Sequence, residues 1–127
     1  MPEKNLYEYA VIRVMPKVER EEFLNVGVVV FCKKAKYLKC LYTIDARRLS
    51  VLCTEFDLDQ LSKNMDAFRK IVDGDKSGGP IAQLDLPSRF RWLTAVRSSA
   101  IQTSRPHPGL STDLDQTLNR LYNDLVL

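Results

Sequence analysis

One stretch of this 127-residue chain has no acidic side chain. From residue 86 to residue 112 neither aspartate nor glutamate occurs. No lysine follows Lys76, although several arginines do. Arginine presents a rigid, planar fork of donors that matches phosphate or carboxylate oxygens, whereas lysine offers a point charge. Arginines without a local counter-charge therefore predict a surface that binds an anion.

Cysteine and long apolar runs are also scarce. The three cysteines, Cys32, Cys40 and Cys53, show no CxxC spacing, so we expect reduced thiols rather than a zinc or redox site. The longest apolar run, residues 26–32, is far shorter than the roughly 20 residues of a membrane helix. Residues 1–5 are polar and do not resemble a signal peptide. These features predict a cytoplasmic protein that does not contact a membrane.

The charge excess is small, at +3 from nineteen basic and sixteen acidic residues. This is too little to make the whole molecule a nucleic-acid binder, so any preference for anions must come from local clustering. The length and the 45% hydrophobic content are those of one domain with one core. We expect a single domain over residues 1–127, with the glycine-rich residues 74–80 as a candidate internal hinge.

The first half of the chain has the pattern of a β-sheet. Residues 7–14 and 37–44 alternate in hydrophobicity, which is typical of half-buried strands. Residues 28–31 are apolar throughout and predict a strand that is covered on both faces. Together they predict a three-stranded antiparallel meander, and residues 100–104 could add a further strand.

Apolar residues at helical spacing predict the remaining elements. The predicted helices cover residues 45–53, 57–74, 87–96 and 112–125. Asp57 and Thr112 are placed to cap the second and fourth of these helices, and Gly74 ends the second. The prolines at 106 and 108 predict a rigid turn. The fold class predicted is α+β: a single compact domain with a mostly antiparallel sheet of three to five strands and packed helices.

The first candidate site lies in the acid-free stretch. Its predicted anion-binding residues are Arg89, Arg91, Arg97, Ser98 and Ser99. Two arginines, together with serine hydroxyls and backbone amides, can hold a phosphate or a nucleic-acid backbone. The alternative is structural, because the same arginines could pair with acids elsewhere in the fold, such as Asp45, Glu22 or Asp113. The sequence leaves both interpretations open.

A second polar cluster surrounds the first predicted turn. Its members are Arg13, Arg20, Glu22, Asn25 and Asp45. Polar residues at a strand end can line a pocket, although Asn25 can also cap a turn before Gly27. Carboxylates such as Glu22, Asp45 and Asp113 could hold a metal, but no short spacing typical of a nuclease links them. No metal ligand, cofactor or catalytic residue is therefore assigned.

Several blocks of the sequence, in order, carry a resemblance to a known family. The blocks cover residues 7–13, 20–28, 45–49, 89–99 and 118–122. They resemble the bacterial family called domain of unknown function 3037, over nearly the whole chain. The resemblance implies no established activity. It does imply a protein partner, a kinase similar to HipA-type toxins.

The function predicted from these observations is that of a non-catalytic interaction module. It would bind a protein partner, with a HipA-like kinase as the candidate that the resemblance implies, through the arginine-rich, acid-free surface. One alternative is a nucleic-acid or nucleotide-phosphate binding protein that uses the same arginines. A second alternative is a metal-dependent phosphodiesterase.

Overall fold

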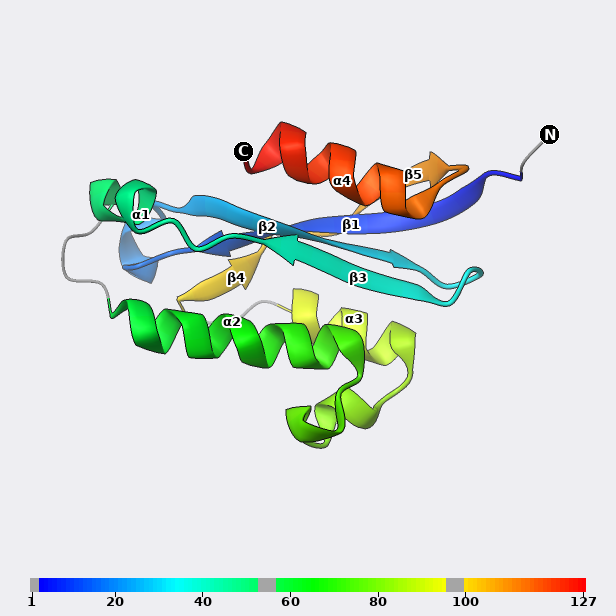
Figure 1. Cartoon of the computed structure of the whole chain (residues 1–127), viewed down its shortest axis with the longest axis horizontal. Coiled ribbons are helices and arrows are strands. Elements are labelled where there is room, and N and C mark those ends of the chain that lie inside the picture. Colours follow the sequence, from blue (N-terminus) through cyan, green and yellow to red (C-terminus); the bar gives the residue numbers. More distant parts are fainter. Residues whose placement is uncertain (1–2, 53–56, 96–99) are drawn as a thin grey trace.

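The computed structural model describes residues 3–52, 57–95 and 100–127. Its strands form one antiparallel sheet in the order β3-β2-β1-β4, and β5 pairs with the first half of β1 (Figure 1). The strands are β1 (Asn5–Val14), β2 (Leu24–Cys32), β3 (Tyr37–Tyr42), β4 (Ile101–Thr103) and β5 (His107–Ser111). The predicted three-stranded meander is confirmed by β1, β2 and β3.

Helices cover both faces of this sheet. They are α1 (Ala46–Leu52), α2 (Leu58–Asp73), α3 (Leu86–Thr94) and α4 (Leu114–Leu125), with short 3-10 helices η1 (Val18–Arg20), η2 (Lys76–Gly78) and η3 (Ile81–Gln83). Helix α4 lies on one face, and α2 and α3 lie on the other (Figure 1). The α+β fold expected from the sequence is confirmed.

Strand β2 is the centre of the core because both of its faces are covered. Residues 26–32 are all buried. On one face Val29 belongs to a cluster that includes Phe90 of α3, and on the other face Val30 belongs to a cluster that includes Leu118 of α4. The uninterrupted apolar run therefore has the position predicted for it, between two layers of helix.

A bulge in β2 sets which side chains share a face near the end of β1. Ile12 lies opposite Gly27, but the next residue, Arg13, lies opposite Asn25. The Asn25 Nδ2 group donates to the Leu125 carbonyl oxygen of α4 at 3.1 Å. Arg13 and Asn25 therefore lie on the face that α4 covers, and not on the face of α2 and α3.

Helix caps explain where two of the helices begin. The Asp57 carboxylate accepts from the Gln60 amide at 3.0 Å, as predicted for α2. The predicted cap of α4 was wrong by one residue, because Asp113 and not Thr112 has its carboxylate on the Gln116 amide, at 3.1 Å. Asp113 also has the extended backbone of a cap residue.

The prediction of a turn at the two prolines was wrong, because this segment includes strand β5. Pro108 lies opposite Glu8 on the outer strand of the sheet. Proline is tolerated at such an edge, since its missing N–H can face solvent. Gly109 lies under the ring of Tyr7, so that a Cβ at this position would collide with the ring. Glycine is therefore required here by close packing.

Candidate functional site

Arg89, a predicted anion-binding residue, lies inside the protein. Its side chain is only 8% exposed. The Nη1 group donates to the carbonyl oxygens of Ile71 at 3.1 Å and Val72 at 3.3 Å, in the last turn of α2. Gly74, which ends α2 with φ 69°, leaves the room that this guanidinium occupies. Arg89 thus caps a helix C-terminus, where carbonyl groups lack helical partners and a cation is favoured.

The rest of the predicted anion site is only partly described. Arg91 is exposed, and no ion pair to it occurs among residues 3–52, 57–95 and 100–127. Its charge helps to lower the pKa of Asp85, after the hydrogen bonds that Ser88 donates to that carboxylate. Arg97, Ser98 and Ser99 lie outside the described residues. An anion contact by Arg91 stays a prediction.

The second predicted cluster separates into pairs with different roles. Arg20 forms an ion pair with Glu22 at the surface. Asp45 caps α1, because its carboxylate accepts from the amides of Arg47 at 3.0 Å and Arg48 at 3.4 Å. Of the five residues, Arg13 and Asn25 are the two that the sheet register places directly opposite each other.

Arg13 and Asn25 have buried atoms without partners. The Arg13 guanidinium lies over the ring of Phe23, with its Cζ atom 4.2 Å from the ring centroid. Within the described part of the chain, Arg13 Nε and Asn25 Oδ1 are buried and lack hydrogen-bond partners. A donor and an acceptor that stay unsatisfied are costly, and proteins usually supply them with ordered water or a ligand.

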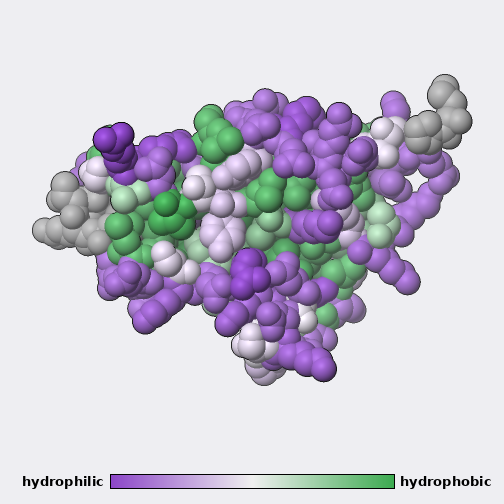
Figure 2. All heavy atoms as spheres, viewed as in Figure 1, coloured by the Kyte–Doolittle hydropathy of each residue, from purple (hydrophilic) through white to green (hydrophobic). Residues whose placement is uncertain are grey.

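A groove along the outer edge of β3 was not predicted from the sequence. The groove has a volume of about 450 Å³. It is lined by Lys39, Cys40 and Leu41 of β3, by Asp73 at the end of α2, and by Asp115, Leu118 and Asn119 of α4. Figure 2 shows apolar and weakly polar surface along the middle of the molecule, between hydrophilic surfaces above and below. No described strand pairs with this edge.

Hydrogen bonds fix the α4 wall of this groove. The Tyr37 hydroxyl donates to Asp115 Oδ1 at 2.7 Å, and Lys39 Nζ lies 3.3 Å from the same oxygen. These two bonds lower the pKa of Asp115. Burial, and next the bond to Asp115, raise the pKa of Tyr37 well above its usual value. Burial raises the pKa of the Cys40 thiol to about 12, so the floor of the groove is a neutral thiol.

A comparison with known families gives a match. Residues 9–126 match the model of a family described as protein of unknown function (DUF3037). The chain belongs to that family. No curated protein and no solved structure matches it. The resemblance seen in the sequence is confirmed for the DUF3037 family.

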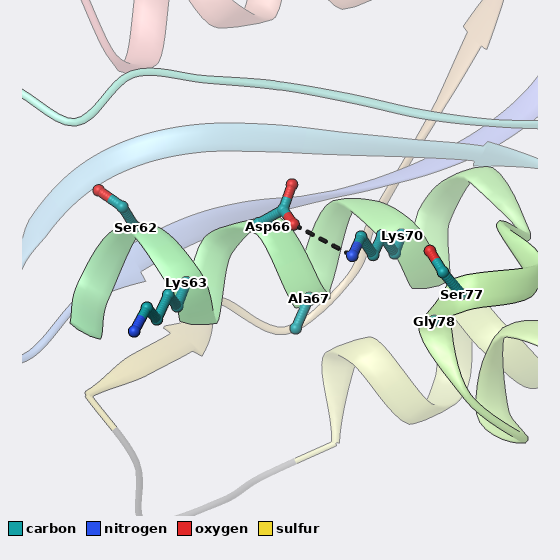
Figure 3. A pocket seen from close by; sticks show the side chains of 7 residues that line it. All are labelled: Ser62, Lys63, Asp66, Ala67, Lys70, Ser77 and Gly78. Carbon is teal, nitrogen blue, oxygen red and sulfur yellow. Dashed lines mark ion pairs between the residues drawn. The ribbon is translucent and has the colours of Figure 1, made fainter. Parts of the chain in front are cut away.

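A second groove of this DUF3037 protein lies on α2. It measures about 480 Å³ and is lined by Ser62, Lys63, Asp66, Ala67, Lys70, Ser77 and Gly78 (Figure 3). Lys70 forms an ion pair with Asp66 at 3.4 Å, while Lys63 extends away from that pair (Figure 3). The charged groups do not converge on one point, so this groove is the weaker candidate.

The described part of this DUF3037 protein has neither a metal-binding cluster nor a membrane-spanning helix. Within residues 3–52, 57–95 and 100–127, no three histidine, cysteine, aspartate or glutamate side chains are grouped so that they could hold a metal ion. Over the same residues, no helix is long and apolar enough to cross a membrane. The carboxylates of Asp45 and Asp113, considered as metal ligands from the sequence, cap two different helices.

Proposed function

We propose that this protein is a non-catalytic interaction module that binds an extended segment of a protein partner along the edge of β3. The observation that carries the proposal is the outer edge of β3, which pairs with no described strand and forms the floor of a groove between two helices. Extended peptides commonly add a strand to such edges, where main-chain hydrogen bonds supply affinity and side-chain pockets supply specificity.

The backbone of β3 has the required donors and acceptors. The Thr43 amide donates inward to the Val26 carbonyl oxygen at 2.8 Å. Because N–H and C=O groups alternate in direction along an antiparallel strand, those of Tyr42, Cys40 and Leu38 point outward. Three residues of β3 are therefore available to pair with an added strand.

The walls of the groove indicate what that strand should look like. Successive side chains of an added strand would point alternately toward α2 and α4. Cys40 and Leu41 favour small apolar side chains at the centre, while the flanks are polar, because Asp73 pairs with Arg69 and Asp115 with Lys39. Since both helices contribute to the lining, the strand edge is recessed, which favours a single segment over the sheet edge of a second copy.

The predicted arginine-rich contact surface loses Arg89 to the interior and retains Arg91 at the surface. A HipA-like kinase, the partner implied by the resemblance, is the first candidate to test. The phosphodiesterase alternative has no converging carboxylates in the described part of the chain to support it.

The test is a selection of displayed linear peptides on the whole protein, followed by affinity measurements with the best synthetic peptide and with candidate kinases. Cys40→Pro removes an outward-facing N–H and should weaken peptide binding at least tenfold. Cys40→Val keeps that N–H and an apolar side chain, so it should bind like the wild type. Circular dichroism and urea unfolding check that both variants are folded.

A peptide series tests the same contact if Cys40→Pro does not fold. Two peptides are compared, one methylated at the odd-numbered backbone nitrogens and one at the even-numbered nitrogens. Only one of these sets of N–H groups faces β3, so one peptide should lose binding and the other should keep it. Equal effects in the two peptides, or selected peptides that bind elsewhere, would refute strand addition. A concentration-dependent dimer lost in Cys40→Pro would identify a second copy as the occupant instead.

A further inference from the structure

We propose that the sheet face formed by β1, β4 and β5 binds single-stranded nucleic acid through Tyr9, His107 and Arg13. This surface is separate from the β3 groove, on the opposite side of the sheet order. It is also distinct from the arginine cluster predicted from the sequence. A different observation carries it: two rings, and an arginine that has no ion pair among the described residues, share one incompletely covered face.

The geometry of the sheet places these side chains together. Tyr9 and Arg13 are four residues apart on β1 and so point to the same face. His107 lies opposite Tyr9, with the two ring centroids 5.3 Å apart. Helix α4 packs on this face mainly against β2 and β3, which leaves Tyr9 and Arg13 half-buried and His107 exposed.

The strands beside β1 at this surface carry no acidic residue. The acid-free residues 86–112 become α3, β4 and β5, so one side of β1 is bordered by strands without carboxylates. Among the described residues, neither Arg13 nor Arg105 forms an ion pair. The contact with Phe23 orients the Arg13 guanidinium without neutralising it.

Unsatisfied groups mark the arginine end of the surface. Arg13 Nε and Asn25 Oδ1, on directly opposed residues, are buried without partners in the described part of the chain. The edges of nucleobases carry both acceptors and donors, and phosphate oxygens accept from arginine. A nucleotide can therefore satisfy a donor and an acceptor that a simple anion cannot satisfy together.

The spacing of the surface indicates an oligomer and not a single nucleotide. Four residues of a strand span about 13 Å between Tyr9 and Arg13. This is several times the rise of about 3.4 Å per nucleotide in a stacked strand. A base stacked at Tyr9 and His107 and a nucleotide at Arg13 would then belong to different positions of one strand, as in proteins that combine stacking rings with cations.

Fluorescence anisotropy with labelled single-stranded RNA and DNA of mixed sequence tests the proposal, at about 50 and about 200 mM salt. At pH 8, His107→Ala should weaken binding roughly five- to hundredfold through lost stacking, with little change in salt dependence. Arg13→Ala should weaken it about tenfold and reduce the salt slope by about one. Arg69→Ala, which removes an equal charge from α2 on the other face, should have no effect.

Three results would overturn the proposal. They are no binding of either strand at low salt, equal losses in Arg13→Ala and Arg69→Ala, and equally tight binding of heparin, which has no bases to stack. Because His107 is exposed, His107→Ala should fold even if Arg13→Ala does not, and unchanged binding in that variant would also refute the role of the rings. The β3 peptide should not compete, so this test is independent of the strand-docking proposal.

Discussion

At the scale of single residues, arginine side chains complete helix ends in this protein. Arg89 donates to the last carbonyl groups of α2, and Arg48 Nη1 donates to the Val126 carbonyl oxygen, just beyond α4, at 2.7 Å. Asn25 donates to Leu125 in the same region. Side chains from distant parts of the chain thus satisfy carbonyl groups that the helices leave open.

Removal of Arg89 should therefore destabilise the fold. Arg89→Ala removes the donor to the Val72 carbonyl oxygen and one of two donors to the Ile71 carbonyl oxygen, which also accepts from the Gly74 amide, and it opens a space beside Gly74. Hydrogen bonds to charged groups contribute about 1.5–3 kcal/mol, so we expect the free energy of unfolding to fall by about 2–4 kcal/mol. Urea unfolding followed by circular dichroism measures this change.

Arg91→Ala is the matched control on the same helix. Arg91 is exposed, so its removal should change the free energy of unfolding by no more than about 0.5 kcal/mol. Equal losses of unfolding free energy in the two variants would show that the buried hydrogen bonds of Arg89 do not stabilise the fold more than an exposed arginine does.

The sequence could predict some residue roles but not these. Asp57 was identified as a cap because its partner is only three residues away. The partners of Arg89 are seventeen and eighteen residues away, and the partner of Asn25 is one hundred residues away. An arginine that donates to carbonyl groups has no acidic partner that the sequence could reveal. The acid-free stretch therefore indicated an exposed cluster, whereas of its described arginines Arg89 is buried and Arg91 is exposed.

At the scale of elements, the β2–β3 hairpin turn includes a strained residue. Lys36 has φ 52°, in the left-handed region that side chains with a Cβ disfavour. Its amide donates to the Lys33 carbonyl oxygen at 3.2 Å. The turn closes the hairpin whose second strand is the proposed docking edge.

Lys36→Gly should stabilise the protein. Relief of the left-handed strain outweighs the added backbone entropy of glycine, so we expect a gain of about 0.5–1 kcal/mol in the free energy of unfolding. Ala35→Gly, at the preceding residue without positive φ, should instead cost up to about 1 kcal/mol. Urea titrations of both variants give the comparison, and a loss in each would mean that the strain has little energetic weight.

Elements were predictable where local pattern and tertiary environment agree. The apolar run of β2 matches its burial directly, whereas β1 was predicted as an alternating strand although residues 10–12 are all buried in it. Strand β5 was missed because Pro108 and Gly109 are poor strand residues, and their tolerance depends on an edge position and on the Tyr7 ring. The β3 groove was missed because its walls come from α2 and α4, far apart in the sequence.

At the scale of the whole molecule, surface carboxylates link stability to pH. The pKa is lowered in Asp66, Asp75, Asp85 and Asp115, in each case chiefly by hydrogen bonds that the carboxylate accepts. An aspartate in an unfolded chain titrates near pH 3.9. The stabilisation from these groups is thus fully present above about pH 4 and is lost as the pH falls through the lower pKa of the folded state.

Asp85→Asn tests this linkage at one position. Asparagine is as good a helix cap as aspartate, so the Ser88 contact and the start of α3 should survive at neutral pH. Asparagine cannot take up a proton, so the free energy of unfolding should fall less steeply below about pH 4 in the variant than in the wild type. Repulsion among the nineteen basic residues rises in both proteins and largely cancels in the comparison. Urea titrations from about pH 7 to about pH 2 measure the two slopes, and identical slopes would show that protonation of Asp85 does not contribute to acid unfolding.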